Sequence, residues 1–387
     1  MLFRAKKQIA NSGILALVLL LAGMSVVAMA CGTETVEVTR EVEVIREVEK
    51  EVAVEVEVEV TREVEKEVVV EKEVVVEKEV VVEVTAEVEK EPIIFSDLNW
   101  TSSEIQVRVA KYIVEHGYGY PTDAIAGDTI SLFEGLKNND TDVTMEIWLP
   151  NQQEVWDAAL ESGVVVDVGK SLEDNWQGFV IPQYVKDANP DLVSVTDIPE
   201  HMDLFVTADS NGKARMVDCI PGWACEVVNS EKIVTYGLED HVELVNPGSG
   251  AGLFADLEAA YAKGDNWLGY LWGPTKPSAE LDLYILEEPP YSDECWESGK
   301  GCAYPTAEIK IAVHETLIER APELVQFFRR WDFTAGSHIE TEAWMTENNE
   351  TTDAAAVYYL QNFSDIWEEY VPADVATRVH DALAQEG

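Results

Sequence analysis

Three tryptophans of the chain share one local setting and could together recognise a cation. Trp148, Trp223 and Trp272 each lie beside proline or glycine, near the point where a short apolar segment gives way to a loop. A quaternary ammonium group has no N–H to donate, so proteins bind it through the π faces of aromatic rings. Three desolvated rings would contribute roughly 2–6 kcal/mol, beside the roughly 8 kcal/mol of micromolar binding. These residues therefore predict an aromatic box for a cationic group.

The elements that must position these indoles are short strands. Strands expected over 143–148, 216–218 and 267–272 end at or shortly before the three tryptophans. In open α/β sheets, ligands bind at the carboxyl edge of the strands, where such side chains would meet. The alternative is that each indole simply covers the end of its own sheet.

From Ile93 onward, short apolar strands alternate with amphipathic helices. Further strands are expected over 93–95, 164–168 and 309–313, and helices over 103–116, 131–136, 153–162, 252–263, 317–330, 350–369 and 373–385. This alternation predicts an α/β fold with mainly parallel sheets and helices on both faces. The 295 residues from position 93 can form two lobes.

The N-terminus predicts export. Three basic residues precede an apolar run over 14–21, and Ala28-Met29-Ala30 precedes Cys31. This order is typical of a signal peptide over 1–30, and the run is too short for a permanent membrane span. Because Ala-Met-Ala-Cys also fits a lipobox, we expect Cys31 to be lipidated and to anchor the exported chain to the outer face of the cytoplasmic membrane. The alternative is a secreted protein with a free Cys31.

A low-complexity segment separates the anchor from the globular region. Residues 33–92 contain 21 Glu and 22 Val. A ribbon of this composition cannot bury enough apolar surface to fold alone, so we expect a charged, self-repelling spacer. A self-associating β or helical element is the alternative.

Four cysteines remain in the globular region, as two close pairs: Cys219 with Cys225, and Cys295 with Cys302. Export favours disulfides, and four cysteines allow three connectivities, of which short-range pairing is favoured because small loops close easily. A 219–225 disulfide would hold Trp223 rigid and reduce the ordering cost of binding. The backbone N–H groups of Ala224 and Cys225 suit the anionic end of a ligand.

Charge and motifs exclude several functions. The chain has 27 Lys+Arg against 74 Asp+Glu, a formal net charge of −47, which argues against nucleic-acid binding. The sequence lacks HExxH, GxSxG, P-loop and GxGxxG patterns, and its six histidines are scattered. We therefore expect neither catalytic residues nor a metal or cofactor, and the mechanism to be binding.

Cys219-Ile-Pro-Gly-Trp-Ala-Cys225, preceded by Asp209-Ser-Asn-Gly-Lys-Ala, resembles the glycine betaine/proline betaine-binding proteins of ABC importers. Trp148-x-Pro150 and Tyr270-x-Trp-x-Pro274 are similar to two further elements of that family, in order and spacing, and the resemblance covers about 93–387. It implies a two-lobed, type II periplasmic-binding-protein fold that closes on its ligand. Two chain crossings would join the lobes, and we expect them near Phe179–Pro182 and Ala303–Pro305.

The resemblance also assigns roles. Trp148, Trp223 and Trp272 would enclose a trimethylammonium group, and the N–H groups of Ala224 and Cys225 would bind a carboxylate. A histidine of the family is replaced by Gln152, which lies beside Asn151, and either of these two side chains could donate only an uncharged hydrogen bond. Trp100 follows the first strand at a similar edge and is a further candidate for the pocket lining.

The sequence thus predicts a monomeric, lipid-anchored binding protein that serves a membrane permease with a separate ATPase. Its expected parts are a signal peptide (1–30), an anchor and spacer (31–92), lobe 1 (93–181 and 305–387) and lobe 2 (182–304). The rival hypothesis is a surface-displayed interaction or cell-wall protein in which the repetitive stalk is the functional part. An exported hydrolase is a third.

Overall fold

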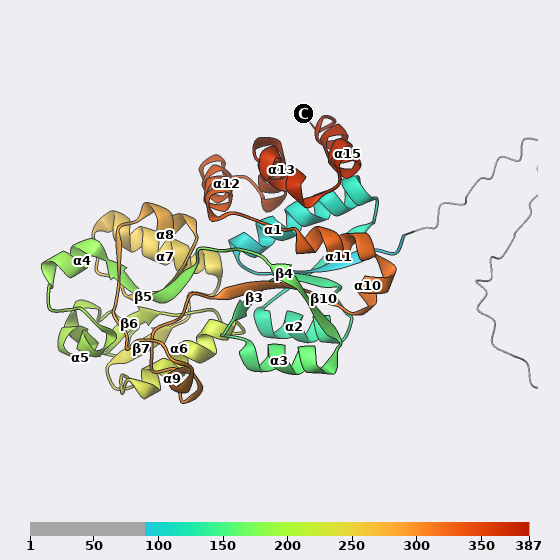
Figure 1. Ribbon diagram of the computed structural model, residues 1–387. Coiled ribbons are helices and arrows are strands. Elements are labelled where there is room, and N and C mark those ends of the chain that lie inside the picture. The colour runs from blue at the N-terminus through green and yellow to red at the C-terminus, as the bar shows by residue number, and fades with distance from the viewer. Residues whose placement is uncertain (1–89, 387) are drawn as a thin grey trace, which may run out of the picture. The chain divides into compact units, whose positions relative to one another are not determined.

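The computed structural model describes residues 90–386. The predicted signal peptide, Cys31 and almost all of the predicted spacer lie outside the described residues. The described chain forms two five-stranded sheets with helices around each (Figure 1). The fold is therefore α/β and two-lobed, as expected.

The first sheet has the strand order β2-β1-β3-β10-β4. Its strands are β1 (Ile93–Leu98), β2 (Thr122–Gly127), β3 (Val143–Leu149), β4 (Val165–Lys170) and β10 (Glu308–His314). Its early helices are α1 (Thr101–Tyr112), continued by the π-helical turn η1 (Ile113–Tyr118), α2 (Thr129–Lys137) and α3 (Gln153–Ser162). Figure 1 shows α1 on one side of β3 and β10, and α2 and α3 on the other.

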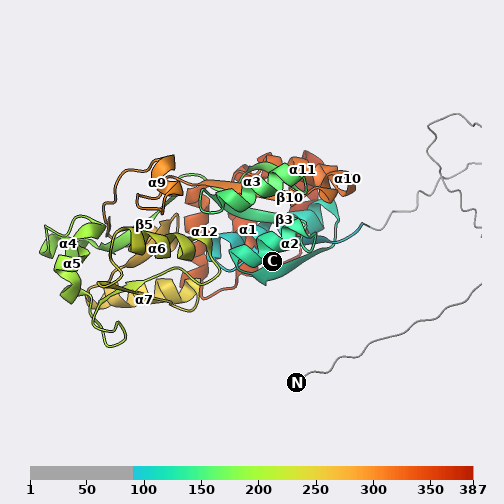
Figure 2. The ribbon, with the colours of Figure 1, turned by 90° about the horizontal axis from the view of Figure 1, so that it is seen from below.

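The second sheet has the corresponding order β7-β6-β8-β5-β9. Its strands are β5 (Trp176–Pro182), β6 (Ala214–Val217), β7 (Val242–Val245), β8 (Gly269–Gly273) and β9 (Leu283–Ile285). Its helices are α4 (Gln183–Ala188), α5 (Ile198–His201), α6 (Ala224–Thr235), α7 (Gly250–Lys263), α8 (Lys276–Glu280) and α9 (Asp293–Glu297), with 3₁₀ turns η2 (Val195–Asp197) and η3 (Met202–Leu204). Figure 1 shows α7 and α8 on one side of β5 and β6, and α6 on the other, and Figure 2 shows α4 and α5 at the end of this lobe away from the first sheet.

Each sheet is mixed rather than mainly parallel as predicted. β10 runs antiparallel to β3 and β4, and β5 runs antiparallel to β8 and β9, whereas the other pairs are parallel. The two reversed strands are the ones that the chain enters when it crosses from one sheet to the other. A strand that enters from the opposite lobe must run against its neighbours, so the carboxyl edges of the parallel strands face the other lobe.

The first crossing lies earlier than predicted. β5 already pairs with the second sheet from Trp176, so the chain leaves the first sheet over 171–175 rather than near Phe179–Pro182. The apolar run at 179–181 is the buried middle of a strand and not a linker. We propose the two sheets as the cores of the two lobes, with the first boundary moved accordingly.

One side chain joins the two crossings. The Asn175 side chain donates from Nδ2 to the Ala307 carbonyl at 2.8 Å and accepts from the Ala307 N–H at Oδ1, also at 2.8 Å. Asn175 is buried, so this reciprocal pair satisfies polar groups that water cannot reach. It ties the segment before β5 to the segment before β10.

The C-terminal helices return to the first lobe. They are α10 (Thr316–Arg320), α11 (Pro322–Arg329), α12 (Ala335–Asn348), α13 (Thr352–Asn362), α14 (Ser364–Trp367), the 3₁₀ turn η4 (Glu368–Tyr370) and α15 (Ala373–Leu383). The single helix predicted over 317–330 is divided because Pro322 starts a new helix and cannot continue the old one. Within residues 90–386, no helix is long and apolar enough to cross a bilayer.

Candidate ligand-binding site

One cavity between the two sheets is lined by all seven residues that the sequence predicts for ligand binding. Its described lining consists of Trp100, Thr129, Trp148, Asn151, Gln152, Gln177, Trp223, Ala224, Cys225, Tyr270 and Trp272. None of these lining residues carries a charge. Attraction of a cation to this lining would therefore depend on the aromatic rings.

Three of the four indoles of the cavity meet edge to face. The ring centroid of Trp223 lies 5.3 Å from that of Trp100 and 5.4 Å from that of Trp272, with interplanar angles of 76° and 84°. Tyr270 stacks on Trp272 at 6.0 Å. The four tryptophans, Trp148 included, are buried. Such T-shaped pairs are favourable, and they present ring faces in different directions.

The four indoles come from corresponding positions of the two lobes. Trp100 follows β1 and is the N-cap residue of α1, while Trp223 is the N-cap residue of α6, the helix after β6. Trp148 and Trp272 are the penultimate residues of β3 and β8, the central strands of the two sheets. This correspondence explains why Trp100 belongs with the other three. Its place after the first strand was the sequence signal that named it as a further candidate for the lining.

A buried carboxylate fixes two of the indoles. Glu146 lies two residues before Trp148 and accepts from Trp100 Nε1 at 2.8 Å, Trp148 Nε1 at 3.0 Å and Gln106 Nε2 at 2.6 Å. Burial raises the pKa of Glu146, and these hydrogen bonds oppose that rise. Gln106 in turn accepts from Trp331 Nε1 at 2.8 Å. The sequence analysis assigned no carboxylate to the site, and Glu146 acts behind the rings as a positioning residue.

Two hydrogen bonds connect the lobes at the edge of the cavity. Trp223 Nε1 donates to Asn99 Oδ1 at 2.6 Å, and the Ile130 N–H donates to the Gly222 carbonyl at 3.3 Å. Gly222 has φ of +96°, and a Cβ there would lie 2.6 Å from Cγ of Asp128 in the other lobe. Only glycine therefore fits this close approach, which brings Trp223 against the first lobe.

The first turn of α6 offers backbone donors to the cavity. Ala224 and Cys225 are the first two residues of this 12-residue helix, and N–H groups at such positions have no partner within the helix. The 219–225 disulfide is formed, with the two Cα atoms 6.0 Å apart, and it closes the loop that carries Trp223. Cys295 pairs with Cys302, so the favoured short-range pairing is confirmed.

Polar residues that the sequence analysis did not predict complete the lining. Gln177 Oε1 accepts from Asn151 Nδ2 at 2.7 Å and from Tyr270 Oη at 2.9 Å. Thr129 starts α2 and is also buried at the cavity. A signal for Gln177 was present, because it is a polar residue inside an otherwise apolar strand.

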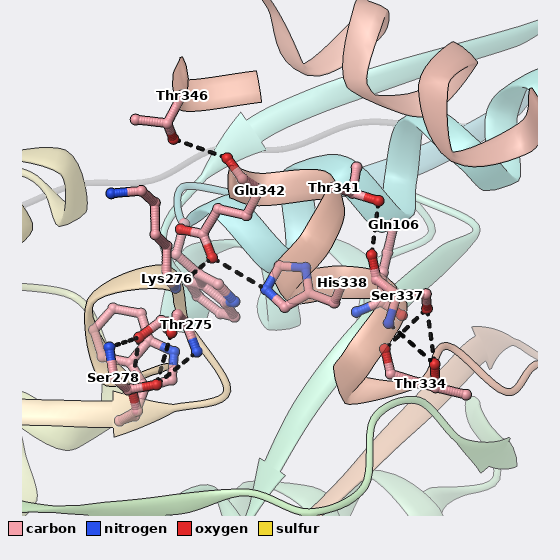
Figure 3. A network of polar contacts seen from close by, with 12 residues as sticks. Gln106, Thr275, Lys276, Ser278, Thr334, Ser337, His338, Thr341, Glu342 and Thr346 are labelled. Atoms are coloured by element: carbon pink, nitrogen blue, oxygen red, sulfur yellow. Dashed lines mark hydrogen bonds and ion pairs between the residues drawn. The ribbon is translucent and has the colours of Figure 1, made fainter. Parts of the chain in front are cut away.

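Helix α12 contacts the loop that follows Trp272 (Figure 3). The Lys276 backbone N–H donates to Glu342 Oε2 at 2.8 Å, and His338 Nε2 lies 3.5 Å from the same oxygen. His338 and Glu342 are buried, and α12 also packs on α13 and α1. A helix of the C-terminal segment thus supports the loop beside an indole of the cavity.

Glu342 should make stability fall as the pH rises. Burial raises its pKa from 4.5 to about 7, with Glu258 and Glu280 adding to the rise and Lys276 opposing it. A carboxyl with a raised pKa in the folded state stabilises the fold fully below its unfolded pKa, and this contribution is lost as the pH rises through 7. Burial lowers the pKa of His338 to about 4, so it stays neutral over that range.

Between pH 5 and 8, the free energy of unfolding of Glu342→Gln should therefore rise by up to about 3 kcal/mol relative to that of the unsubstituted protein. Denaturant unfolding at pH 5, 6, 7 and 8 measures the difference. Parallel stability curves for the two proteins would contradict the assignment.

Among residues 90–386, no group of three or more His, Cys, Asp or Glu side chains is placed to hold a metal ion. The fold and the uncharged aromatic cavity between the lobes fit a solute-binding protein. The chain belongs to the family described as the substrate-binding domain of ABC-type glycine betaine transport systems, which matches residues 91–362.

Individual relatives are more distant. The chain is 26% identical over 290 residues to the trimethylamine N-oxide-binding protein of Pelagibacter ubique, covering 73% of this chain and 91% of that one. It is 25% identical over 212 residues to the glycine betaine/proline betaine-binding periplasmic protein of Escherichia coli, covering 51% and 62%.

Solved structures show the same fold. A glycine betaine and L-proline binding protein of Borrelia burgdorferi aligns with a TM-score of 0.63 at 20% identity, over 74% of this chain and 99% of that one. An ABC-transporter choline-binding protein in complex with choline aligns with a TM-score of 0.65 at 21% identity, over 76% and 98%.

Proposed function

We propose that the protein binds glycine betaine or a closely related quaternary ammonium compound in a cage of tryptophans between its lobes. The observation that carries the proposal is the meeting of Trp100 and Trp148 from one lobe with Trp223 and Trp272 from the other around a single uncharged cavity. Desolvated indole faces attract a methylated cation, and the N–H groups of three of the four indoles donate to other residues. Trp100 and Trp148 donate to Glu146, and Trp223 donates to Asn99.

The polar end of the ligand would meet the first turn of α6. The N–H groups of Ala224 and Cys225 are the donors there, and the positive end of the helix dipole favours an anion. Gln152 is buried on the opposite lobe and lines the same cavity, where it would add an uncharged hydrogen bond. These contacts suit a carboxylate without placing a full positive charge beside the cationic head.

The names of the relatives support this class of ligand. Glycine betaine, choline and trimethylamine N-oxide each carry a nitrogen with three methyl groups, and proteins named for them are among the similar chains. The methylated head is the feature that these compounds share, and the indoles are the feature of the cavity that would recognise it.

The protein would act as a monomeric receptor outside the cytoplasmic membrane. Export and lipidation at Cys31 would anchor it, and the Glu/Val segment over 33–92 would hold the lobes away from the bilayer. Lobe closure on the ligand would present it to a permease that a separate ATPase drives, because the sequence has no nucleotide-binding motif of its own.

Titration calorimetry with glycine betaine, proline betaine, choline and trimethylamine N-oxide tests the proposal. We expect at least one of them to bind with a dissociation constant in the micromolar range or below. Protein with intact disulfides that binds none of the four would contradict it and would favour the surface-display hypothesis.

A further inference from the structure

The side-chain amide of Gln177 is hydrogen-bonded at its oxygen but not at its nitrogen. Its Oε1 accepts two hydrogen bonds, from Asn151 Nδ2 at 2.7 Å and from Tyr270 Oη at 2.9 Å. Its Nε2 is buried and has no hydrogen-bond partner among residues 90–386. A buried donor without a partner is costly, so such a group calls for a functional reason.

The donor is held at the cavity from both lobes. Gln177 is 6% exposed and belongs to β5 of the second sheet, as Tyr270 belongs to β8. Asn151 follows β3 of the first sheet, three residues after Trp148. In this orientation both contacts engage the carbonyl oxygen, and the N–H₂ group is the end left over. Asn151 Oδ1 beside it is likewise buried without a partner among the described residues. Gln177, Asn151 and Tyr270 all line the cavity of the indoles.

We propose that Gln177 is a specificity-determining residue whose Nε2–H donates to an oxygen of the ligand. The inference rests on the proposed function and extends it to the atoms beyond the methylated nitrogen. The ligand class is a trimethylated nitrogen compound with an oxygen acceptor: a carboxylate, an N-oxide or a hydroxyl. Asn151 and Tyr270 act as positioning residues, and closure of the lobes assembles the donor because Asn151 comes from the opposite lobe.

The selectivity follows from the unpaired donor. A ligand with an acceptor oxygen satisfies Nε2 when the lobes close, whereas tetramethylammonium leaves it buried and unpaired. A hydrogen bond to a charged group changes affinity by about 10- to 100-fold. We therefore expect the unsubstituted protein to prefer its best oxygen-bearing ligand over tetramethylammonium by at least that factor.

Two variants test the role of the donor. Gln177→Glu keeps the oxygen that Asn151 and Tyr270 contact and replaces the N–H₂ group by a second oxygen. Gln177→Met removes both ends of the amide. By calorimetry with glycine betaine, trimethylamine N-oxide, choline and tetramethylammonium, both should weaken the best oxygen-bearing ligand by about 10-fold or more. Gln177→Met should leave tetramethylammonium within about threefold, whereas the added carboxylate of Gln177→Glu should strengthen tetramethylammonium binding or leave it unchanged. Gln183→Met, a glutamine at the start of α4 that pairs with Asp187, is the matched control and should change nothing.

The outcomes separate the possible failures. Equal losses for tetramethylammonium and the oxygen-bearing ligands would show a merely structural role and overturn the inference. Unchanged affinity of Gln177→Met for every oxygen-bearing ligand would overturn it too, while leaving the proposed function in place. If Gln177→Met does not fold by circular dichroism, Gln177→Glu decides. An unsubstituted protein that binds none of the four compounds would overturn both proposals together.

Discussion

Trp223→Ala should abolish ligand binding, with a loss of about 100-fold or more. The Trp223 ring lies between two others, with its centroid 5.3 Å from that of Trp100 and 5.4 Å from that of Trp272. Its removal therefore takes away the ring that connects the aromatic residues of the two lobes. The variant also loses the hydrogen bond to Asn99 that joins the lobes. Both effects act in the same direction, because one weakens the ring contacts and the other weakens the closed arrangement.

Titration calorimetry with the best-binding ligand measures this loss, and Trp344→Ala supplies the matched control. Trp344 lies on α12 outside the cavity lining, where it stacks on Tyr358 with ring centroids 4.3 Å apart. Its replacement should leave affinity nearly unchanged. Trp223→Ala protein that binds within tenfold of the unsubstituted protein would rule out a central role for this indole.

Lys232→Met should destabilise the fold by about 3–5 kcal/mol. The Lys232 ammonium is fully buried and lies 2.7 Å from Glu288 Oε1, which also accepts from Tyr236 Oη at 2.8 Å. Lys232 Nζ donates to the Cys302 carbonyl as well. Burial lowers the pKa of Lys232 and raises that of Glu288, while their mutual attraction opposes both shifts. Removing the cation leaves Glu288 buried without its charge partner.

Lys137→Met is the control for this prediction. Lys137 forms an ion pair with Glu134 at 2.7 Å on the surface of α2, and exposed pairs of this kind contribute little. Denaturant unfolding should show a change below about 0.5 kcal/mol for Lys137→Met. A similarly small change for Lys232→Met would mean that methionine packs well enough to offset the lost pair.

Strong apolar periodicity made most of the fold predictable, and the failures have physical reasons. β2 escaped prediction because Thr122–Gly127 is an edge strand with several exposed positions and little apolar character. α12 escaped because Ala335–Asn348 buries polar side chains such as His338 and Glu342, so its sequence lacks an apolar stripe. In both segments tertiary contacts, rather than local pattern, fix the secondary structure.

The site was predictable where the residue type and its local sequence were enough to indicate a function. The indoles beside proline and glycine indicated the cavity, and the cysteine pair around Trp223 indicated the rigid loop. Glu146 could not be assigned in the same way, because the role of an acid in a strand depends on neighbours from other elements. Gln177 was visible only as a polar residue inside an apolar strand, which does not show what the side chain contacts. Gln106, which holds Glu146, comes from a helix 40 residues earlier in the chain.

The equivalent origins of the four indoles bear on how an apparent dissociation constant should be interpreted. Each lobe alone contributes one indole from the N-cap of a helix and one from its central strand, which amounts to half of an enclosure. If only about 1% of unliganded molecules were closed, measured affinity would be about 100-fold weaker than that of the closed form. Substitutions that break the two hydrogen bonds between Asn175 and Ala307 would then change the measured affinity. They would do so by changing the fraction of unliganded molecules that are closed, without altering any atom that contacts the ligand.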